Sequence, residues 1–147
     1  MKCNLQMMNE ISNICLTGLH LPDELQLWVD KGFIEEDGCV FLSALFNGNP
    51  GTGKLVDRTG VECFVNSFHI EDFITERYLD YSCLFCNHLL KRWYENDLNE
   101  KKELNVIIML DEFGAVIKFH LKRENEHWLG SDLEKYEEAI LETTKPF

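Results

Sequence analysis

The sequence predicts an α+β fold, in which helices pack on an antiparallel sheet of about four strands in two hairpins. Three observations predict this class. Hydrophobic residues alternate with a period of two along residues 104–122, apolar residues recur at helical spacing along residues 72–97, and the predicted strands come in adjacent pairs. A chain of 147 residues, of which 45% are hydrophobic, suits one compact domain. We therefore expect residues 1–147 to form a single α+β domain.

Two helices are predicted at the beginning of the chain. Residues 4–16 carry apolar side chains at three- and four-residue spacing, which is typical of a weakly amphipathic helix. A stronger helix follows from Pro22, because proline in a first turn needs no partner for its missing N–H. Two acids follow this proline at the positive end of the helix dipole, and Gly32 ends the helix.

The middle of the chain predicts a hairpin and the longest helix. Residues 38–46 are apolar on both faces and residues 61–70 alternate, so both are expected to be strands. The glycine-rich residues 47–60 should join them. Residues 72–97 are predicted as the longest helix, because a buried stripe follows its apolar positions. These positions are Phe73, Leu79, Cys83, Cys86, Leu90 and Trp93, widened by Phe85 and Leu89.

The strongest pattern is a hairpin over residues 104–122. One face of each strand is apolar: Leu104, Val106, Ile108 and Leu110 on the first, and Ala115, Ile117, Phe119 and Leu121 on the second. Residues 111–114 make the turn, in which Gly114 is free to adopt a positive φ. On the other face, Ile107 and Met109 should be covered, whereas Lys118, His120 and Lys122 are expected to meet solvent.

An acidic helix is predicted at the end of the chain. Residues 131–134 have the capping-box pattern S-x-x-E, and the helix should continue to about Glu142. Residues 124–142 contain seven acids and one base, a net charge of −6. The predicted order of elements is thus α, α, β, β, α, β, β, α, ending on a strongly acidic surface.

The overall charge restricts the partners. The chain has 26 acidic and 14 basic residues, and its net charge of −12 should repel nucleic acid and anionic membranes. Such a charge favours a basic protein partner, or serves solubility alone. No apolar run is long enough for a transmembrane helix, and polar residues interrupt the first 18 residues, so we expect neither a membrane span nor a secretory signal. The expected location is the cytoplasm.

Residues 48–54 match the spacing G-x-x-x-x-G-K of a phosphate-binding loop. That mechanism also requires a helix after the loop and a Ser or Thr after the lysine, to hold Mg²⁺. Here Leu55 occupies that position, and a strand is expected to follow. A hairpin connection is therefore the favoured interpretation, and a nucleotide-binding protein or small enzyme using this loop is the alternative.

The six cysteines include a C-x-x-C pair, Cys83 and Cys86, with His88 nearby. Zinc needs four ligands and no second half-site exists, so buried thiols without metal are favoured. A redox pair is disfavoured because these residues lie far from a helix N-terminus, where the dipole would lower a thiol pKa. The five histidines fall in unrelated elements, and no catalytic motif is present. We expect no enzymatic activity, no cofactor and no metal site.

Exposed acids beside aromatic residues are the candidate binding surface. Acids speed the encounter with a cationic partner, and aromatic side chains anchor it. The candidate partner-binding residues are Glu124, Glu126, Trp128, Asp132, Glu134, Glu137 and Glu138 near the end of the chain, with Asp111 and Glu112 in the hairpin turn. Phe113 and Tyr136 are further possible anchors.

The ending VIKFHLKRENEHWLGSDLEKYEEAILETT, a strand followed by W-L-G-x-D-L-E-x-Y and an acidic segment, resembles bacterial immunity proteins of contact-dependent growth inhibition and related polymorphic toxin systems. The resemblance implies a basic, nuclease-like toxin domain as partner and one-to-one inhibition. The acids would then cover the basic cleft of the toxin. An acidic adaptor subunit for another basic protein is a further alternative.

Overall fold

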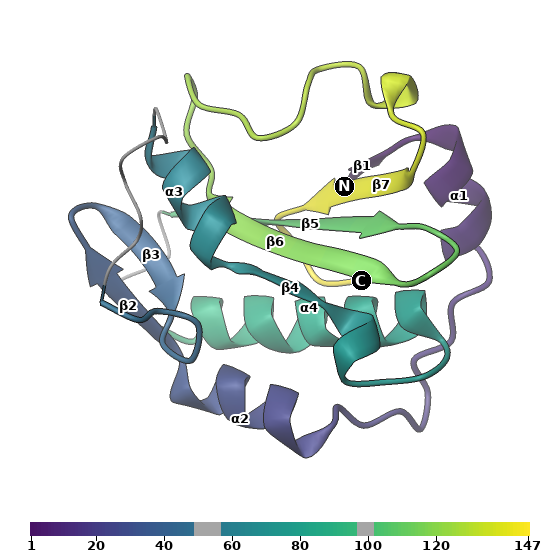
Figure 1. Cartoon of the computed structure of the whole chain (residues 1–147), viewed down its shortest axis with the longest axis horizontal. Coiled ribbons are helices and arrows are strands. Elements are labelled where there is room, and N and C mark those ends of the chain that lie inside the picture. The colour runs from purple at the N-terminus through teal and green to yellow at the C-terminus, as the bar shows by residue number, and fades with distance from the viewer. Residues whose placement is uncertain (49–56, 97–101) are drawn as a thin grey trace.

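The computed structural model describes residues 1–48, 57–96 and 102–147 (Figure 1). It confirms the predicted α+β class. A five-stranded antiparallel sheet has the order β1-β7-β5-β6-β4, and β2 and β3 form a separate two-stranded sheet. The strands are β1 (Lys2–Cys3), β2 (Phe33–Glu36), β3 (Cys39–Leu42), β4 (Ser67–His69), β5 (Leu104–Leu110), β6 (Ala115–Leu121) and β7 (Ala139–Thr143). The helices are α1 (Leu5–Ile11), α2 (Asp23–Lys31), α3 (Arg58–Val65) and α4 (Tyr78–Tyr94), with 3-10 turns η2 (Ile70–Asp72) and η4 (Leu133–Lys135).

The predicted hairpin is confirmed at the centre of the sheet. β5 pairs with β6 from Leu104↔Leu121 to Leu110↔Ala115. The glycine in its turn has a different role from the expected one, because Gly114 is not among the residues of positive φ. A Cβ on Gly114 would collide with the carboxylate of Glu71, whose Oε2 accepts a hydrogen bond from the backbone N–H of Ala115 at 3.0 Å. A side chain at this position would push the Glu71 carboxylate away from its hydrogen bond with Ala115.

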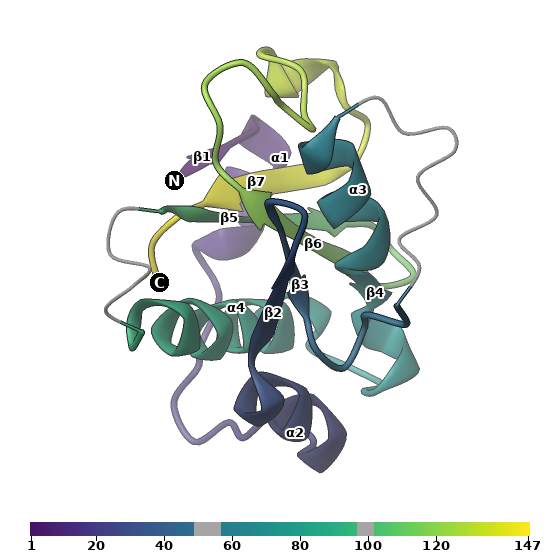
Figure 2. The ribbon, with the colours of Figure 1, turned by 90° about the vertical axis from the view of Figure 1, so that its left-hand side faces the viewer.

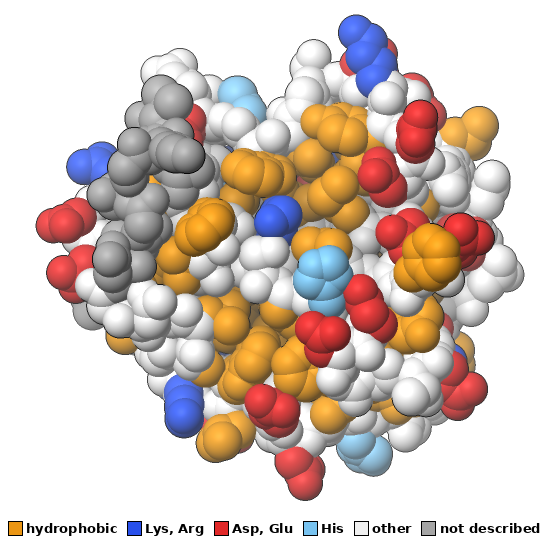
Figure 3. Space-filling model, in the orientation of Figure 1, with side chains coloured by type: hydrophobic (Ala, Val, Ile, Leu, Met, Phe, Trp, Pro, Cys, Tyr) orange, Lys and Arg blue, Asp and Glu red, His pale blue; other side chains and the backbone are white. Residues whose placement is uncertain are grey.

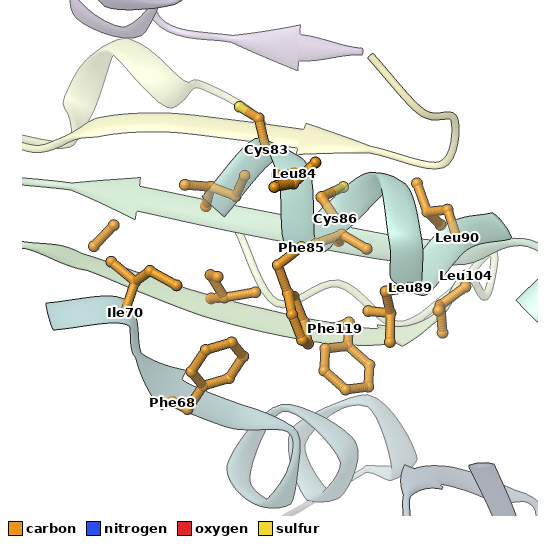
Figure 4. Close-up of a cluster of buried hydrophobic side chains, with 14 of the residues drawn as sticks. Phe68, Ile70, Cys83, Leu84, Phe85, Cys86, Leu89, Leu90, Leu104 and Phe119 are labelled. Carbon is orange, nitrogen blue, oxygen red and sulfur yellow. The ribbon is translucent and has the colours of Figure 1, made fainter. Parts of the chain in front are cut away.

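The main core lies between one face of the sheet and α4. The alternating apolar residues of β5, β6 and β7 face α4, and α2 packs on the outside of α4 (Figure 2). Phe85 of α4 meets Phe68 of β4 with ring centres 4.9 Å apart (Figure 4). Cys83 and Cys86 lie fully buried in this core as free thiols, on the apolar stripe that the sequence predicts. The predicted long helix exists but begins later, at Tyr78.

The prediction of one long strand over residues 61–70 was wrong. Helix α3 occupies Arg58–Val65, and only Ser67–His69 form a strand. The side chain of Asp57 caps α3 by accepting a hydrogen bond from the backbone N–H of Gly60 at 2.7 Å. Val61, Cys63 and Val65 fit a strand period, but a helix turn also buries Val61 and Cys63. Short apolar runs are ambiguous between the two periods.

The strand predicted over residues 38–46 is shorter and has a different partner. β3 covers Cys39–Leu42 and pairs with β2, a strand that the sequence analysis missed. Asp37 and Gly38 connect them, both with positive φ, which is the geometry of a tight two-residue hairpin turn. The tight turn at Asp37 and Gly38 therefore favours the pairing of β3 with β2. The predicted pairing of residues 38–46 with residues 61–70 does not form.

The prediction of an acidic C-terminal helix was also wrong. Only the short η4 turn forms within residues 131–142, and its cap is Asp132, whose Oδ1 accepts the backbone N–H of Glu134 at 3.1 Å. The remainder becomes strand β7, inserted between β5 and β1. Ile140 and Leu141 are fully buried, one on each face of the sheet. Strand pairing on both sides thus outweighed the helical pattern of this segment.

Candidate partner-binding strap and pocket

Residues 122–138 form a strap that joins β6 to β7. It leaves β6 beside the Leu104↔Leu121 pair and enters β7 beside the Leu110↔Ala139 pair, at the opposite end of the hairpin. The strap therefore runs the length of the sheet, about 20 Å for seven residues per strand. It arches over the side of the sheet that faces away from α4 (Figures 1 and 2). Seven of the nine predicted site residues lie on this strap.

Two of its carboxylates hold the strap against helix N-termini. Glu126 Oε1 accepts the backbone N–H of Thr59 in the first turn of α3 at 3.2 Å. Glu134 Oε1 accepts the backbone N–H of Leu5, the first residue of α1, at 2.9 Å. The first N–H groups of a helix lack partners within it, and an acid there also interacts with the helix dipole. Glu126 and Glu134 therefore position the strap.

Three other strap acids remain available to a partner. Glu124, Asp132 and Glu137 are exposed, and none of them forms an ion pair within residues 1–48, 57–96 and 102–147. Glu138 is half-buried, and its backbone carbonyl accepts a hydrogen bond from Asn4 Nδ2 at 2.8 Å. The first three carboxylates are thus open to a partner.

The structure brings the hairpin turn close to one end of the strap only. Asp111 and Glu112 follow Leu110, and Glu138 precedes its partner Ala139, so these acids share one end of the sheet. Glu124 lies at the opposite end. The turn is ordered by Asp111 Oδ1, which accepts the backbone N–H groups of the two residues that close the turn at 2.8 and 3.1 Å. The predicted acids therefore form two groups rather than one helix face.

Exposed aromatic side chains accompany both groups. Trp128 on the strap is 39% exposed, and Phe113 in the turn is 75% exposed. The Nζ of Lys118 lies 5.2 Å from the ring centre of Trp128 and 2.8 Å from Ser67 Oγ. Burial lowers the pKa of Lys118, which is half-buried instead of fully solvated. On the side of the molecule that faces the viewer in Figure 1, Figure 3 shows a cationic side chain near the centre with hydrophobic side chains around it.

A pocket of about 600 Å³ lies beneath the first half of the strap. Its lining includes Trp128 and Glu124 of the strap, Asn105 of β5, His120 of β6 and Glu142 of β7. Asn105 Nδ2 lies 2.9 Å from Glu142 Oε2 and 3.3 Å from His120 Nε2. The pocket floor is therefore a polar network across three neighbouring strands.

The burial of His120 corrects the sequence analysis, which placed it in solvent. It is only 4% exposed, and its Nδ1 donates to the backbone carbonyl of Leu121 at 2.7 Å. Burial lowers its pKa, so the ring is neutral near pH 7. Asn105 and Glu142 were likewise missed. The available signal was a polar residue near the same end of three largely apolar strands, but the pairing of β7 with β5 could not be known from the sequence.

Within the described residues, the remaining sequence motifs add no further site. Among the described residues, no three His, Cys, Asp or Glu side chains lie close enough together to hold a metal ion. In the same part of the chain, no helix is long and apolar enough to cross a membrane. Of the predicted loop over residues 48–54, all but Gly48 lie outside the described residues.

Fold and site together define a small α+β protein that carries an acidic strap over a polar pocket. The chain belongs to the Uncharacterized protein PM0498 family, whose model matches residues 2–146. Uncharacterized protein PM0498 of Pasteurella multocida (strain Pm70) is 26% identical over 104 residues, which cover 64% of this chain and 66% of that protein. The match thus spans about two thirds of the relative's length. No solved structure matches the chain significantly.

Proposed function

We propose that this protein is a cytoplasmic immunity protein, which binds one basic antibacterial toxin domain, most simply a nuclease, and covers its active cleft. One observation carries the proposal. Unpaired acids and an exposed tryptophan share a strap that two helix N-termini hold in place. A binding surface that is already ordered loses little conformational entropy when its partner arrives.

The charge of the strap suits such a target. A toxin that cleaves nucleic acid needs a basic cleft to bind phosphates. The whole chain has a net charge of −12, and Glu124, Asp132 and Glu137 present carboxylates without internal ion pairs among the described residues. Opposite charges on two proteins accelerate association and orient the partners. These acids would occupy the positions that phosphates take in the toxin.

The aromatic residues would supply most of the affinity. Trp128 and Phe113 are large and exposed, and acids lie near them in the sequence. Protein–protein interfaces typically combine such aromatic hot-spot residues with a polar rim. Asp111 and Glu112 would extend the contact to the hairpin turn. The proposal thus assigns contact with the toxin to the free acids and aromatic residues, and assigns Glu126 and Glu134 to the support of the strap.

Growth rescue by co-expression tests this function. The proposal expects a large toxin gene directly beside the gene for this chain. The toxin to use is the C-terminal domain encoded there, expressed alone or with this chain. We expect the wild-type chain to restore growth. The triple variant Glu124→Lys, Asp132→Lys and Glu137→Lys should slow association with the purified toxin by about tenfold or more at low salt, because it reverses the steering charges. Rescue should weaken accordingly.

The matched control reverses three exposed acids away from the strap, Glu24, Glu76 and Glu95. It changes the net charge equally, so it separates local contact from overall charge. We expect its affinity to stay within about threefold of wild type at 0.15 M salt. Absence of binding between wild type and the toxin would refute the proposed function. Equal affinities of the strap triple variant and wild type would refute the assigned surface.

A further inference from the structure

The pocket floor contains a buried amide that is only half satisfied. Asn105 is 7% exposed, and its Nδ2 donates to Glu142 Oε2 at 2.9 Å and to His120 Nε2 at 3.3 Å. These two contacts use both hydrogens of the amide nitrogen. Its Oδ1 accepts no hydrogen bond from the described part of the chain. No fully buried side-chain nitrogen or oxygen of the described residues lacks a partner, so solvent in the pocket must reach this oxygen.

The orientation of this amide is determined by its neighbours. His120 Nδ1 lies 2.7 Å from a backbone carbonyl oxygen, so Nδ1 carries the proton and Nε2 must accept. The carboxylate of Glu142 can also only accept. Asn105 therefore directs its nitrogen at both groups, and its oxygen is left for another donor. Because Asn105 lines the pocket, a donor that enters the pocket can reach it.

Most of the cationic side chains that line the pocket are already paired. Lys122 pairs with Glu103 at 3.2 Å, and Arg123 pairs with Glu62 and with Glu126. Lys2 lies 3.9 Å from Glu142 Oε1, at the outer limit of an ion pair, and its side chain is 80% exposed. Glu124 at the rim has no ion pair within the described residues. Met1, which carries the α-amino group, and His127 also line the pocket. The acceptors open to a ligand are the amide oxygen of Asn105 and the carboxylates of Glu124 and Glu142.

We propose that this pocket binds the guanidinium group of an arginine side chain. A guanidinium has five N–H donors in a planar fork and no acceptor, which complements Asn105 Oδ1 and the carboxylates of Glu142 and Glu124. Trp128 in the pocket lining offers an aromatic ring on which that plane can stack. The inference rests on the proposed function, because the arginine would come from the basic toxin domain.

A titration with N-acetyl-L-arginine methylamide tests this inference on the full chain. The side-chain amide of Asn105 and the indole N–H of Trp128 are followed by ¹H–¹⁵N NMR. We expect saturable shifts of both signals with a Kd in the millimolar range, because one side chain makes few contacts. The citrulline analogue has the same shape without the charge, and it should shift neither signal at equal concentration.

Two variants make the test specific to the pocket. Glu142→Gln keeps an acceptor for Asn105 but removes the charge, and we expect it to weaken arginine binding by about tenfold. Glu76→Gln removes one charge at an exposed position away from the strap and should leave the Kd unchanged. If the spectrum of Glu142→Gln shows a changed fold, Glu124→Gln replaces it, with a smaller loss expected at the rim.

The outcomes separate this inference from the proposed function. Absence of saturation, equal binding of the citrulline analogue, or an unchanged Kd in both Glu142→Gln and Glu124→Gln would each overturn the arginine site. A toxin bound with wild-type affinity by a folded Glu142→Gln variant would also overturn it, while the immunity function would stand. Specific arginine binding without any bound toxin would support the site and leave the proposed function refuted.

Discussion

The carboxylate of Glu62 on α3 is fully buried and pairs with Arg123 at the start of the strap. Glu62 Oε2 also accepts the backbone N–H of Leu121 at 2.9 Å. Arg123 donates further hydrogen bonds to Thr59 Oγ1 at 3.0 Å and to the backbone carbonyl of Gly38 at 3.2 Å. Burial raises the pKa of Glu62, and Arg123 opposes that rise. This one pair therefore links α3, the strap and the β2–β3 turn.

Removal of the arginine should be strongly destabilising. Arg123→Met leaves Glu62 buried without its cation, and we expect a loss of about 3–5 kcal/mol in the free energy of unfolding, measured with urea. Lys122→Met is the matched control, because Lys122 pairs with Glu103 at an exposed position and should change stability by less than about 1 kcal/mol. Similar losses in the two variants would contradict the assigned importance of the buried pair.

The strap should loosen when its helix contacts are removed. Glu134→Ala and Glu126→Ala each delete a carboxylate that accepts a helix N-terminal N–H. We expect each to lower the free energy of unfolding by about 0.5–2 kcal/mol and to speed hydrogen exchange in the strap. Glu124→Ala and Glu137→Ala should have little effect on either measurement. Faster exchange in all four variants would show that the strap acids act through their charge alone.

A side chain at position 114 should displace the Glu71 carboxylate. Gly114→Ala places a methyl group against the end of this flexible side chain, which would give up its hydrogen bond with Ala115, and we expect a loss of about 0.5–1.5 kcal/mol in thermal or urea unfolding. Gly130→Ala is the control, because its nearest contact would be Tyr136 Oη at an ordinary 3.6 Å. In a Glu71→Ala background the cost of Gly114→Ala should shrink, which a double-mutant cycle measures. If Gly114→Ala costs as much stability in the Glu71→Ala background, contact with Glu71 is not the cause of the loss.

The lowered pKa of His120 predicts a pH dependence with a definite sign. Its ring stays neutral in the folded state at pH values where the unfolded ring, with a pKa of about 6.5, already binds a proton. Stability from His120 is therefore complete above pH 6.5 and decreases as the pH falls below it. The difference in free energy of unfolding between wild type and His120→Gln should shrink between pH 7.5 and pH 5.5. A constant difference would contradict the buried neutral ring.

Exposed and buried cysteines should react with a thiol reagent at different rates. Cys15 is exposed, whereas burial raises the pKa of Cys63 and of Cys83 to about 12. Because the thiolate is the reactive form, Cys15 should react rapidly and the buried thiols only after unfolding. Mass spectrometry after brief alkylation of the native chain checks this. Rapid labelling of Cys83 in the folded protein would contradict its place in the core.

The sequence alone determined the elements whose signal is local and unambiguous. The hairpin of β5 and β6 was predictable because alternation over seven residues per strand matches only a sheet with one buried face. The stripe through Cys83, Cys86 and Leu90 likewise gave the buried face of α4, although not its first residue. The candidate acids were identifiable from charge, but their separation into two groups was not.

Tertiary structure decided the remainder, because those segments satisfy more than one local pattern. Residues 139–143 could form a helix or a strand, and only the partners β1 and β5 made them β7. That insertion placed Glu142 beside Asn105 and His120, three residues that lie far apart in sequence. The strap and its pocket exist because β7 returns to the sheet. The pairing of strands that are distant in sequence leaves no pattern in any short stretch of residues. The sequence alone therefore could not predict the pocket.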